Sequence, residues 1–145
     1  MTAPHLAEEN AERLIVLTER LTERLAADAT AFEARNPLEV AARIEETQRL
    51  ANLYRHESAR VRADPGLVAG ASPKRRQRLM GASKAFEAAL VRHGRALYAA
   101  KEVTEGVVRA IAEEVAAARS TGTGYGPTAR VQEASGAAIA LNRQA

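Results

Sequence analysis

Alanine dominates the apolar content of this chain and limits the folds that it can adopt. The sequence has 145 residues; apolar residues make up 46%, alanine accounts for 33 residues, aromatic residues make up 3% and tryptophan is absent. A thick layered core needs bulky inward side chains, which this chain lacks. Alanine is the best helix former because it loses no side-chain entropy in a helix. The composition therefore predicts a single all-α unit with slender, closely packed helices.

Three helical segments are predicted from their boundary signals. The first covers about residues 6–35. The second begins at Asn36-Pro37, a cap residue followed by a proline in the first helical position, and ends before Asp64-Pro65-Gly66. The third repeats this start at Ser72-Pro73 and extends to about residue 119. Because short connections join antiparallel neighbours, we expect an antiparallel three-helix bundle with coiled-coil-like packing and a long third helix.

The large side chains recur at helical spacing in all three segments. The expected inward faces are Leu14, Leu17, Leu21, Leu25 and Phe32 in the first segment; Val40, Ile44, Thr47, Ala51, Tyr54, Ser58 and Val61 in the second; and Leu79, Ser83, Phe86, Leu90, Leu97, Thr104, Val108, Ile111, Val115 and Ala118 in the third. The second set alternates steps of four and three, which is a heptad pattern. Residues 1–119 are predicted to form the bundle domain.

Residues 120–145 are predicted to form a flexible, partner-binding C-terminal tail. Glycine, proline and hydroxyl residues in its first part break the helical pattern. Further on, Val131, Ala134, Ala138 and Leu141 fall on one helical face, but such a short, weak stripe does not fold alone in water. We expect this segment to fold against a partner.

Sequence patterns for catalysis and metal binding are missing. The chain has no cysteine, which excludes disulfides, thiolate metal sites and cysteine nucleophiles. His5, His56 and His93 lack metal-ligand spacing and are interpreted as solvated helix residues. No serine lies in a Gly-x-Ser-x-Gly pattern. The sequence therefore predicts a protein that is not an enzyme and that has no cofactor and no metal site.

The charge is unevenly distributed along the chain. Residues 1–71 carry 12 acidic and 9 basic side chains, whereas residues 72–119 carry 5 acidic and 10 basic ones. Opposite signs fit two segments of one bundle that attract each other. The densest basic run contains Lys74, Arg75, Arg76 and Arg78, for which we consider either pairing within the bundle or contact with an acidic partner. Nucleic acid is not expected as a partner, because phosphate binding needs more basic residues along one face.

The N-terminal residues and the hydropathy pattern bear on localisation. The first ten residues lack the basic start and the apolar run of a signal peptide. No stretch approaches the roughly 18 to 20 apolar residues that a membrane span needs. We therefore expect a cytoplasmic protein without an integral membrane segment.

Several segments together resemble a known family. Residues 52–57 (Asn-Leu-Tyr-Arg-His-Glu), the basic start of the third helix, and Tyr125-Gly126-Pro127 before a weakly apolar tail are similar to the alphaproteobacterial branch of the FlgN-type flagellar export chaperones. The resemblance covers residues 6–141. It implies a cytosolic, non-enzymatic helical chaperone of flagellar type III secretion. Such a chaperone binds hook-filament junction (hook-associated) subunits and delivers them to the export apparatus. The family's tail binds the client, which implies partner-binding roles for Tyr125, Pro127, Val131, Ala134, Ala138, Ile139 and Leu141.

Two other interpretations remain open at this point. The heptad pattern of residues 40–61 and the long third helix also fit a self-associating coiled-coil scaffold or adaptor without export clients, including a homodimer. A second alternative is a nucleic-acid or membrane-surface binder that uses residues 74–78. Its binding would fall steeply with salt.

Overall fold

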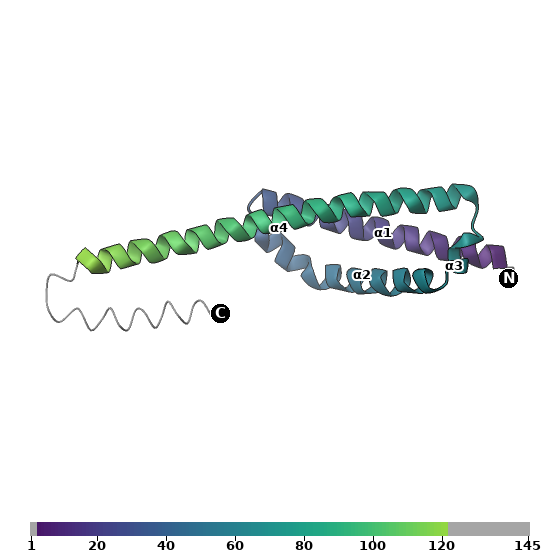
Figure 1. Cartoon of the computed structure of the whole chain (residues 1–145), viewed down its shortest axis with the longest axis horizontal. Helices are drawn as coiled ribbons and strands as arrows, with labels where there is room; N and C mark the ends of the chain where they lie inside the picture. The colour runs from purple at the N-terminus through teal and green to yellow at the C-terminus, as the bar shows by residue number, and fades with distance from the viewer. Residues whose placement is uncertain (1–2, 122–145) are drawn as a thin grey trace. The chain divides into compact units, whose positions relative to one another are not determined.

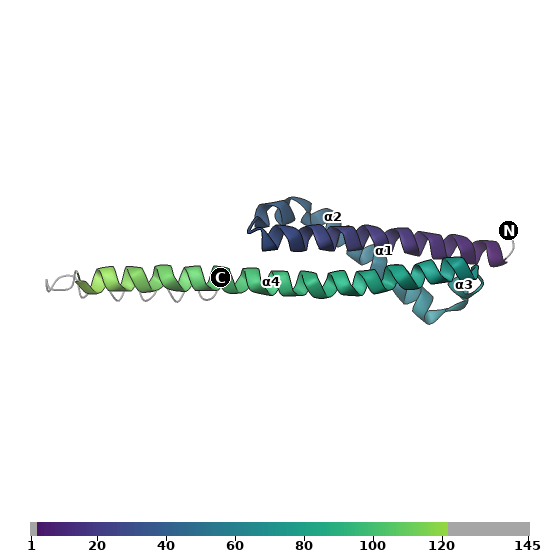
Figure 2. The ribbon, with the colours of Figure 1, turned by 90° about the horizontal axis from the view of Figure 1, so that it is seen from above.

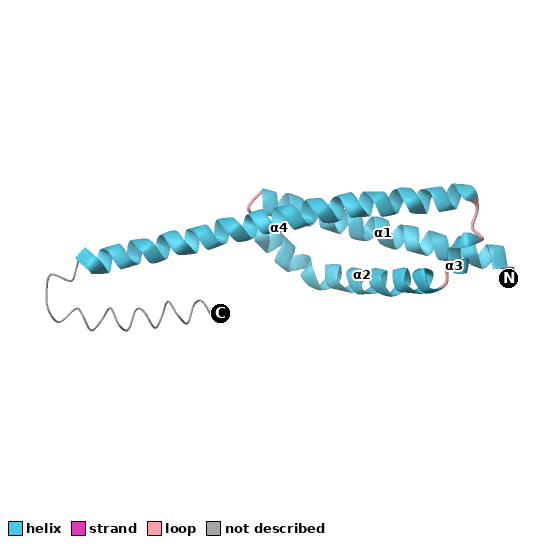
Figure 3. Ribbon diagram, viewed as in Figure 1, coloured by secondary structure: helices cyan, strands magenta, loops and turns pink. Residues whose placement is uncertain are grey.

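Helices make up the part of the chain that the structure describes. A computed structural model describes residues 3–121. These residues form α1 (Ala3–Glu33), α2 (Pro37–Ala63), the single-turn α3 (Gly66–Ala69) and α4 (Pro73–Thr121), and they contain no strand (Figure 3). The prediction of an all-α protein is therefore confirmed. The chain divides into two compact units, Met1–Ala100 and Lys101–Ala145.

The turn between α1 and α2 differs in detail from the prediction. Pro37 is the first residue of α2, as expected, but the side chain of Asn36 makes no capping hydrogen bond. Instead, the Asn36 backbone N–H donates to the Ala31 carbonyl at 2.8 Å, and the Arg35 N–H donates to Phe32 at 3.1 Å. These two bonds form a Schellman motif, with Arg35 left-handed at φ 58°. Asn36 therefore takes part in ending α1 through its backbone.

The connection from α2 to α4 folds back onto the beginning of α1. Its short helix α3 places Val68 against a buried cluster of Ala7, Ala11 and Ala71. The next helix, α4, begins as predicted, because the Ser72 hydroxyl accepts a hydrogen bond from the Arg75 N–H at 3.3 Å. The cap and the alanine cluster thus close this end of the bundle.

The first helix supplies most of the core. It lies antiparallel to α2 and parallel to the first part of α4, up to residue 100 (Figures 1 and 2). Contact with both neighbours buries a wide face, which contains Ala7, Ala11, Leu14, Ile15, Leu17, Thr18, Leu21, Leu25, Asp28, Ala29 and Ala31. The four predicted leucines are among them, and Phe32 is half-buried. Alanine supplies seven of the twelve buried apolar side chains, so the core is thin, as the composition predicts.

The second helix presents a half-buried face and has no fully buried residue. Six of its seven predicted inward positions are half-buried, but Ile44 is 48% exposed. That prediction is wrong for Ile44 because the neighbouring residue, Arg43, lies against α1 and contacts Asp28. At this end, α2 therefore presents Arg43, and not Ile44, to α1.

The inward face of α4 up to residue 100 agrees with the prediction only in its first part, where Leu79, Ser83 and Phe86 are half-buried. Leu90 and Leu97 are 49% and 47% exposed, whereas Ala82 and Ala96 are buried and His93 is half-buried. Small side chains at the contact let two helices approach closely, because the axial distance depends on side-chain size. The prediction is wrong for Leu90 and Leu97 because it followed the largest side chains at these positions.

Candidate functional site

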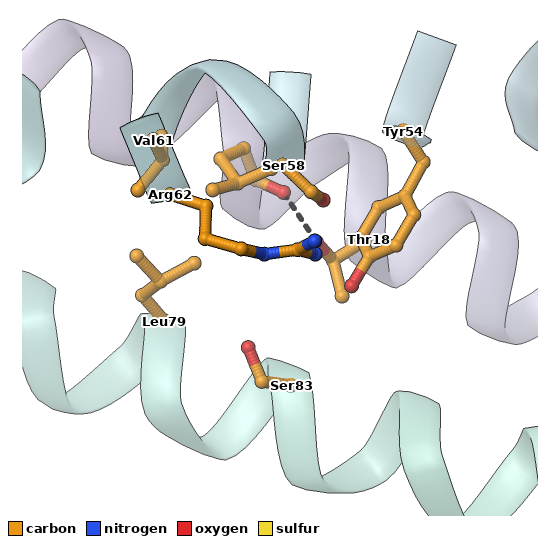
Figure 4. A pocket seen from close by; sticks show the side chains of 8 residues that line it. Thr18, Tyr54, Ser58, Val61, Arg62, Leu79 and Ser83 are labelled. Carbon is orange, nitrogen blue, oxygen red and sulfur yellow. Dashed lines mark hydrogen bonds between the residues drawn. The ribbon is translucent and has the colours of Figure 1, made fainter. Parts of the chain in front are cut away.

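A groove lies between the three long helices of the unit Met1–Ala100. Its volume is about 280 Å³, and its lining comes from all three helices (Figure 4). The lining residues are Leu14 and Thr18 of α1, Tyr54, Ser58, Val61 and Arg62 of α2, and Leu79 and Ser83 of α4. The groove therefore forms only when the bundle has folded.

The groove combines apolar walls with a charged residue at its rim. Leu14, Val61 and Leu79 form the apolar walls. Arg62 is exposed, and its side chain extends across the groove toward Thr18 and Tyr54 (Figure 4). The Thr18 hydroxyl is already occupied, since it donates to the Leu14 carbonyl at 2.6 Å. Such a lining suits an apolar side chain of a peptide with a carboxylate nearby, as amphipathic helices present.

The aromatic side chains at the groove are fixed by packing. The ring of Tyr54 packs on Phe86 of α4, with ring centroids 4.6 Å apart. This contact joins α2 to α4 and confirms that Tyr54 packs in the bundle. Among the described residues, no group of three or more His, Asp or Glu side chains is placed to hold a metal ion.

A buried charged cluster joins the three helices near the end of α1. Asp28 is 3% exposed; its Oδ1 lies 3.5 Å from the Arg43 guanidinium, and its Oδ2 lies 3.8 Å from His93 Nε2. The His93 ring also contacts Phe32 edge-on at 5.9 Å. His93 is therefore a packed residue, and its interpretation as solvated is wrong. Asp28 follows Leu21 and Leu25 at heptad spacing, and this spacing is the sequence signal that Asp28 faces the other helices.

The basic run at the beginning of α4 is partly paired within the bundle. The Arg75 guanidinium lies 3.2 Å from Glu8 and 3.3 Å from Glu12, and Arg78 lies 3.0 Å from Glu12. Lys74 and Arg76 are exposed, and neither forms an ion pair within residues 3–121. Pairing within the bundle therefore accounts for Arg75 and Arg78, and the other two remain candidates for an acidic partner.

Two carboxylates of α1 have lowered pKa values through contacts with α4. The backbone N–H of Ser72 and then its side chain lower the pKa of Glu8, with a smaller contribution from Arg75. Two hydrogen bonds of 3.0 Å from Arg92 lower the pKa of Glu33. The same contact raises the pKa of Arg92. These two contacts connect α1 to α4 at both ends.

The lowered pKa values predict that the bundle loses stability in acid. A carboxyl with a lowered folded pKa stabilises the fold fully above its unfolded pKa, near 4.5, and this contribution is lost as the pH falls through the folded value. The melting temperature should therefore fall between pH 5 and pH 3, and less so in Glu33→Gln, as thermal circular dichroism can measure. Glu23→Gln, which changes an exposed α1 carboxylate, is the control. The same slope in wild type and Glu33→Gln would contradict the prediction.

The partner-binding residues predicted in the tail lie outside the described residues. This applies to Tyr125, Pro127, Val131, Ala134, Ala138, Ile139 and Leu141. Their role and the boundary at residue 120 stay predictions. In residues 3–121, no helix has both the length and the apolar content that membrane crossing requires.

The fold and its surfaces define an all-helical bundle protein with a groove between its three long helices. Over an aligned length of 142 residues, the chain is 54% identical to the flagellar basal-body protein FlbY of Caulobacter vibrioides. The aligned segment covers 96% of this chain and 95% of that protein. The chain belongs to the family of this flagellar protein. No protein-family model matches the chain, and neither does any solved structure.

Proposed function

We propose that this chain is a cytoplasmic, non-enzymatic chaperone of flagellar type III export. It binds hook-filament junction subunits and delivers them to the export apparatus. The observation that carries this proposal is the 54% identity to a flagellar protein along nearly the whole chain. The similarity to FlgN-type export chaperones adds the client class, and the absence of a metal cluster in residues 3–121 fits a role in binding.

The groove suggests how a client segment is held. An amphipathic client helix would place an apolar side chain between Leu14, Val61 and Leu79, and a carboxylate beside Arg62. The groove is shallow because the helices that form it carry many small side chains. The tail would add a second contact through its apolar residues. A segment that becomes ordered on binding pays an entropy cost, which keeps affinity modest and permits release at the export gate.

A pull-down of hook-filament junction proteins tests the role of the tail. The full chain should retain these proteins, and the triple variant Val131→Ser, Ile139→Ser, Leu141→Ser should lose most of the recovery because it removes the largest aliphatic tail residues. The matched control, Ala129→Ser, Ala137→Ser, Ala140→Ser, introduces three serines in the same segment and should bind normally. Equal recovery by the two variants contradicts tail binding, and no recovery by the wild-type chain contradicts the chaperone proposal.

The same assay tests the groove separately. Arg62→Glu reverses the charge at the rim without changing a buried residue, and it should reduce recovery if a client carboxylate lies there. Arg49→Glu makes the same change at an exposed position of α2 that does not line the groove. Equal recovery by these two variants would exclude the rim contact and leave the tail as the binding segment.

A further inference from the structure

The part of α4 beyond residue 100 exposes large apolar side chains. Val108 is 57% exposed, Ile111 56% and Val115 41%. Isolated exposed apolar residues are common on protein surfaces, whereas a row of them along one helix face marks an interaction surface. The spacing of these residues along the helix indicates what covers them.

The exposed residues belong to a heptad pattern that runs through Lys101, Thr104, Val108, Ile111, Val115 and Ala118. The steps are three, four, three, four and three residues, which places Lys101, Val108 and Val115 at a positions and Thr104, Ile111 and Ala118 at d positions. β-Branched valine is a residue that two-stranded parallel coiled coils use at a positions, and a lysine at one a position specifies the register at a cost in stability.

The flanking charges favour a second copy of this chain as the partner. Glu114 occupies a g position and Arg119 the e position five residues later. A parallel, in-register pair places each g residue beside the e residue of the next heptad on the other helix. Within one helix, residues five apart do not meet, and neither side chain has an ion pair among residues 3–121. An antiparallel pair would separate Glu114 from Arg119.

We propose that residues 101–121 of α4 pair with the same residues of a second copy as a parallel two-stranded coiled coil. Each pair of chains then forms two contacts between Glu114 and the partner's Arg119. Three heptads form a short interface, so the dimer is weak and depends on concentration. This proposal rests on the exposed helix face and is independent of the chaperone role, since its tests use no client.

Disulfide cross-linking of the full-length chain tests the pairing and its register. The chain has no cysteine, so each introduced thiol reports on a single position. Ala118→Cys, at a d position, should form a disulfide-linked dimer with several times the yield of Ala117→Cys, at the outward c position. Equal yields, or a low yield at both positions, would overturn the proposal.

Reversing the charges of Glu114 and Arg119 tests whether a second copy of this chain, and not another partner, covers this helix face. Sedimentation of the full-length chain should show a monomer-dimer equilibrium. Glu114→Lys should raise its Kd about tenfold, because two attractive pairs become repulsive. Combining it with Arg119→Glu should restore the wild-type Kd, and Glu113→Lys, at the outward f position, should leave it unchanged. A monomer at every concentration, or a double variant that dimerises no more tightly than Glu114→Lys, would overturn the proposal.

Discussion

Replacing Ile15 by alanine lowers the free energy of unfolding by about 3 kcal/mol. Ile15 is fully buried on α1, at 0% exposure, and it is one of few large side chains in a core made mainly of alanine. Truncation removes buried methyl groups and leaves a cavity that the close-packed helices fill only in part. In a protein with marginal stability, this loss is a large share of the total.

Urea unfolding followed by circular dichroism measures this loss. The matched control is Ile44→Ala, which removes the same atoms from a side chain that is 48% exposed. It should change the free energy of unfolding by less than about 1 kcal/mol, because less surface returns to water and alanine is the better helix former. Equal losses in the two variants would show that Ile15 is not in the core.

Replacing Asp28 by alanine is expected to cost about 2 kcal/mol of stability. Asp28 is 3% exposed, and within residues 3–121 it is the acidic residue that both the Arg43 guanidinium and His93 contact. Its removal leaves the Arg43 charge without a partner, and Arg43 Nε is already buried without a hydrogen bond. The cost lies below that of a fully buried pair because Arg43 and His93 are partly solvated.

A double variant separates this electrostatic cost from the loss of packing. Arg43→Leu removes the charge that Asp28→Ala leaves unpaired, so the combined variant should lose less stability than the sum of the two single variants. The urea transitions of the three variants and of wild type give this coupling. Glu19→Ala, at an exposed position of α1, controls for the helix substitution itself. Additive losses would contradict a coupled cluster.

The thin core and the groove have the same origin in the sequence. Alanine fills seven of the twelve buried apolar positions, and few large side chains cover the space between the helices. The groove lined by Leu14, Val61 and Leu79 remains open as a result. A bundle of this kind offers a surface to peptides without a deep cavity, which agrees with the proposed binding role.

The helix boundaries could be predicted from local signals. Pro37 and Pro73 begin α2 and α4, and the predicted end before Asp64 agrees with a last residue at Ala63. Proline geometry and capping act within a few residues, so they operate before the helices meet. The leucines of α1 were also predicted correctly, because α1 contacts two neighbours and buries a wide face.

Parts of the inward faces of α2 and α4 could not be predicted in the same way. Periodicity follows large side chains, and it selected Leu90 and Leu97, whereas α4 approaches α1 through Ala82 and Ala96. In α2, Arg43 faces α1 in place of Ile44 because the Arg43 guanidinium contacts Asp28 of α1. Neither outcome is local, since each depends on a residue more than ten positions away in the chain.

The sequence by itself thus determined the helices, their ends, their order and the small size of the core, because capping, proline geometry and alanine content act locally. Only the tertiary structure decided that Ile44, Leu90 and Leu97 are exposed, where Asp28, Arg43 and His93 meet, and where the groove opens. These features depend on how closely two helices approach and on which charges become neighbours, and both are properties of pairs of distant residues.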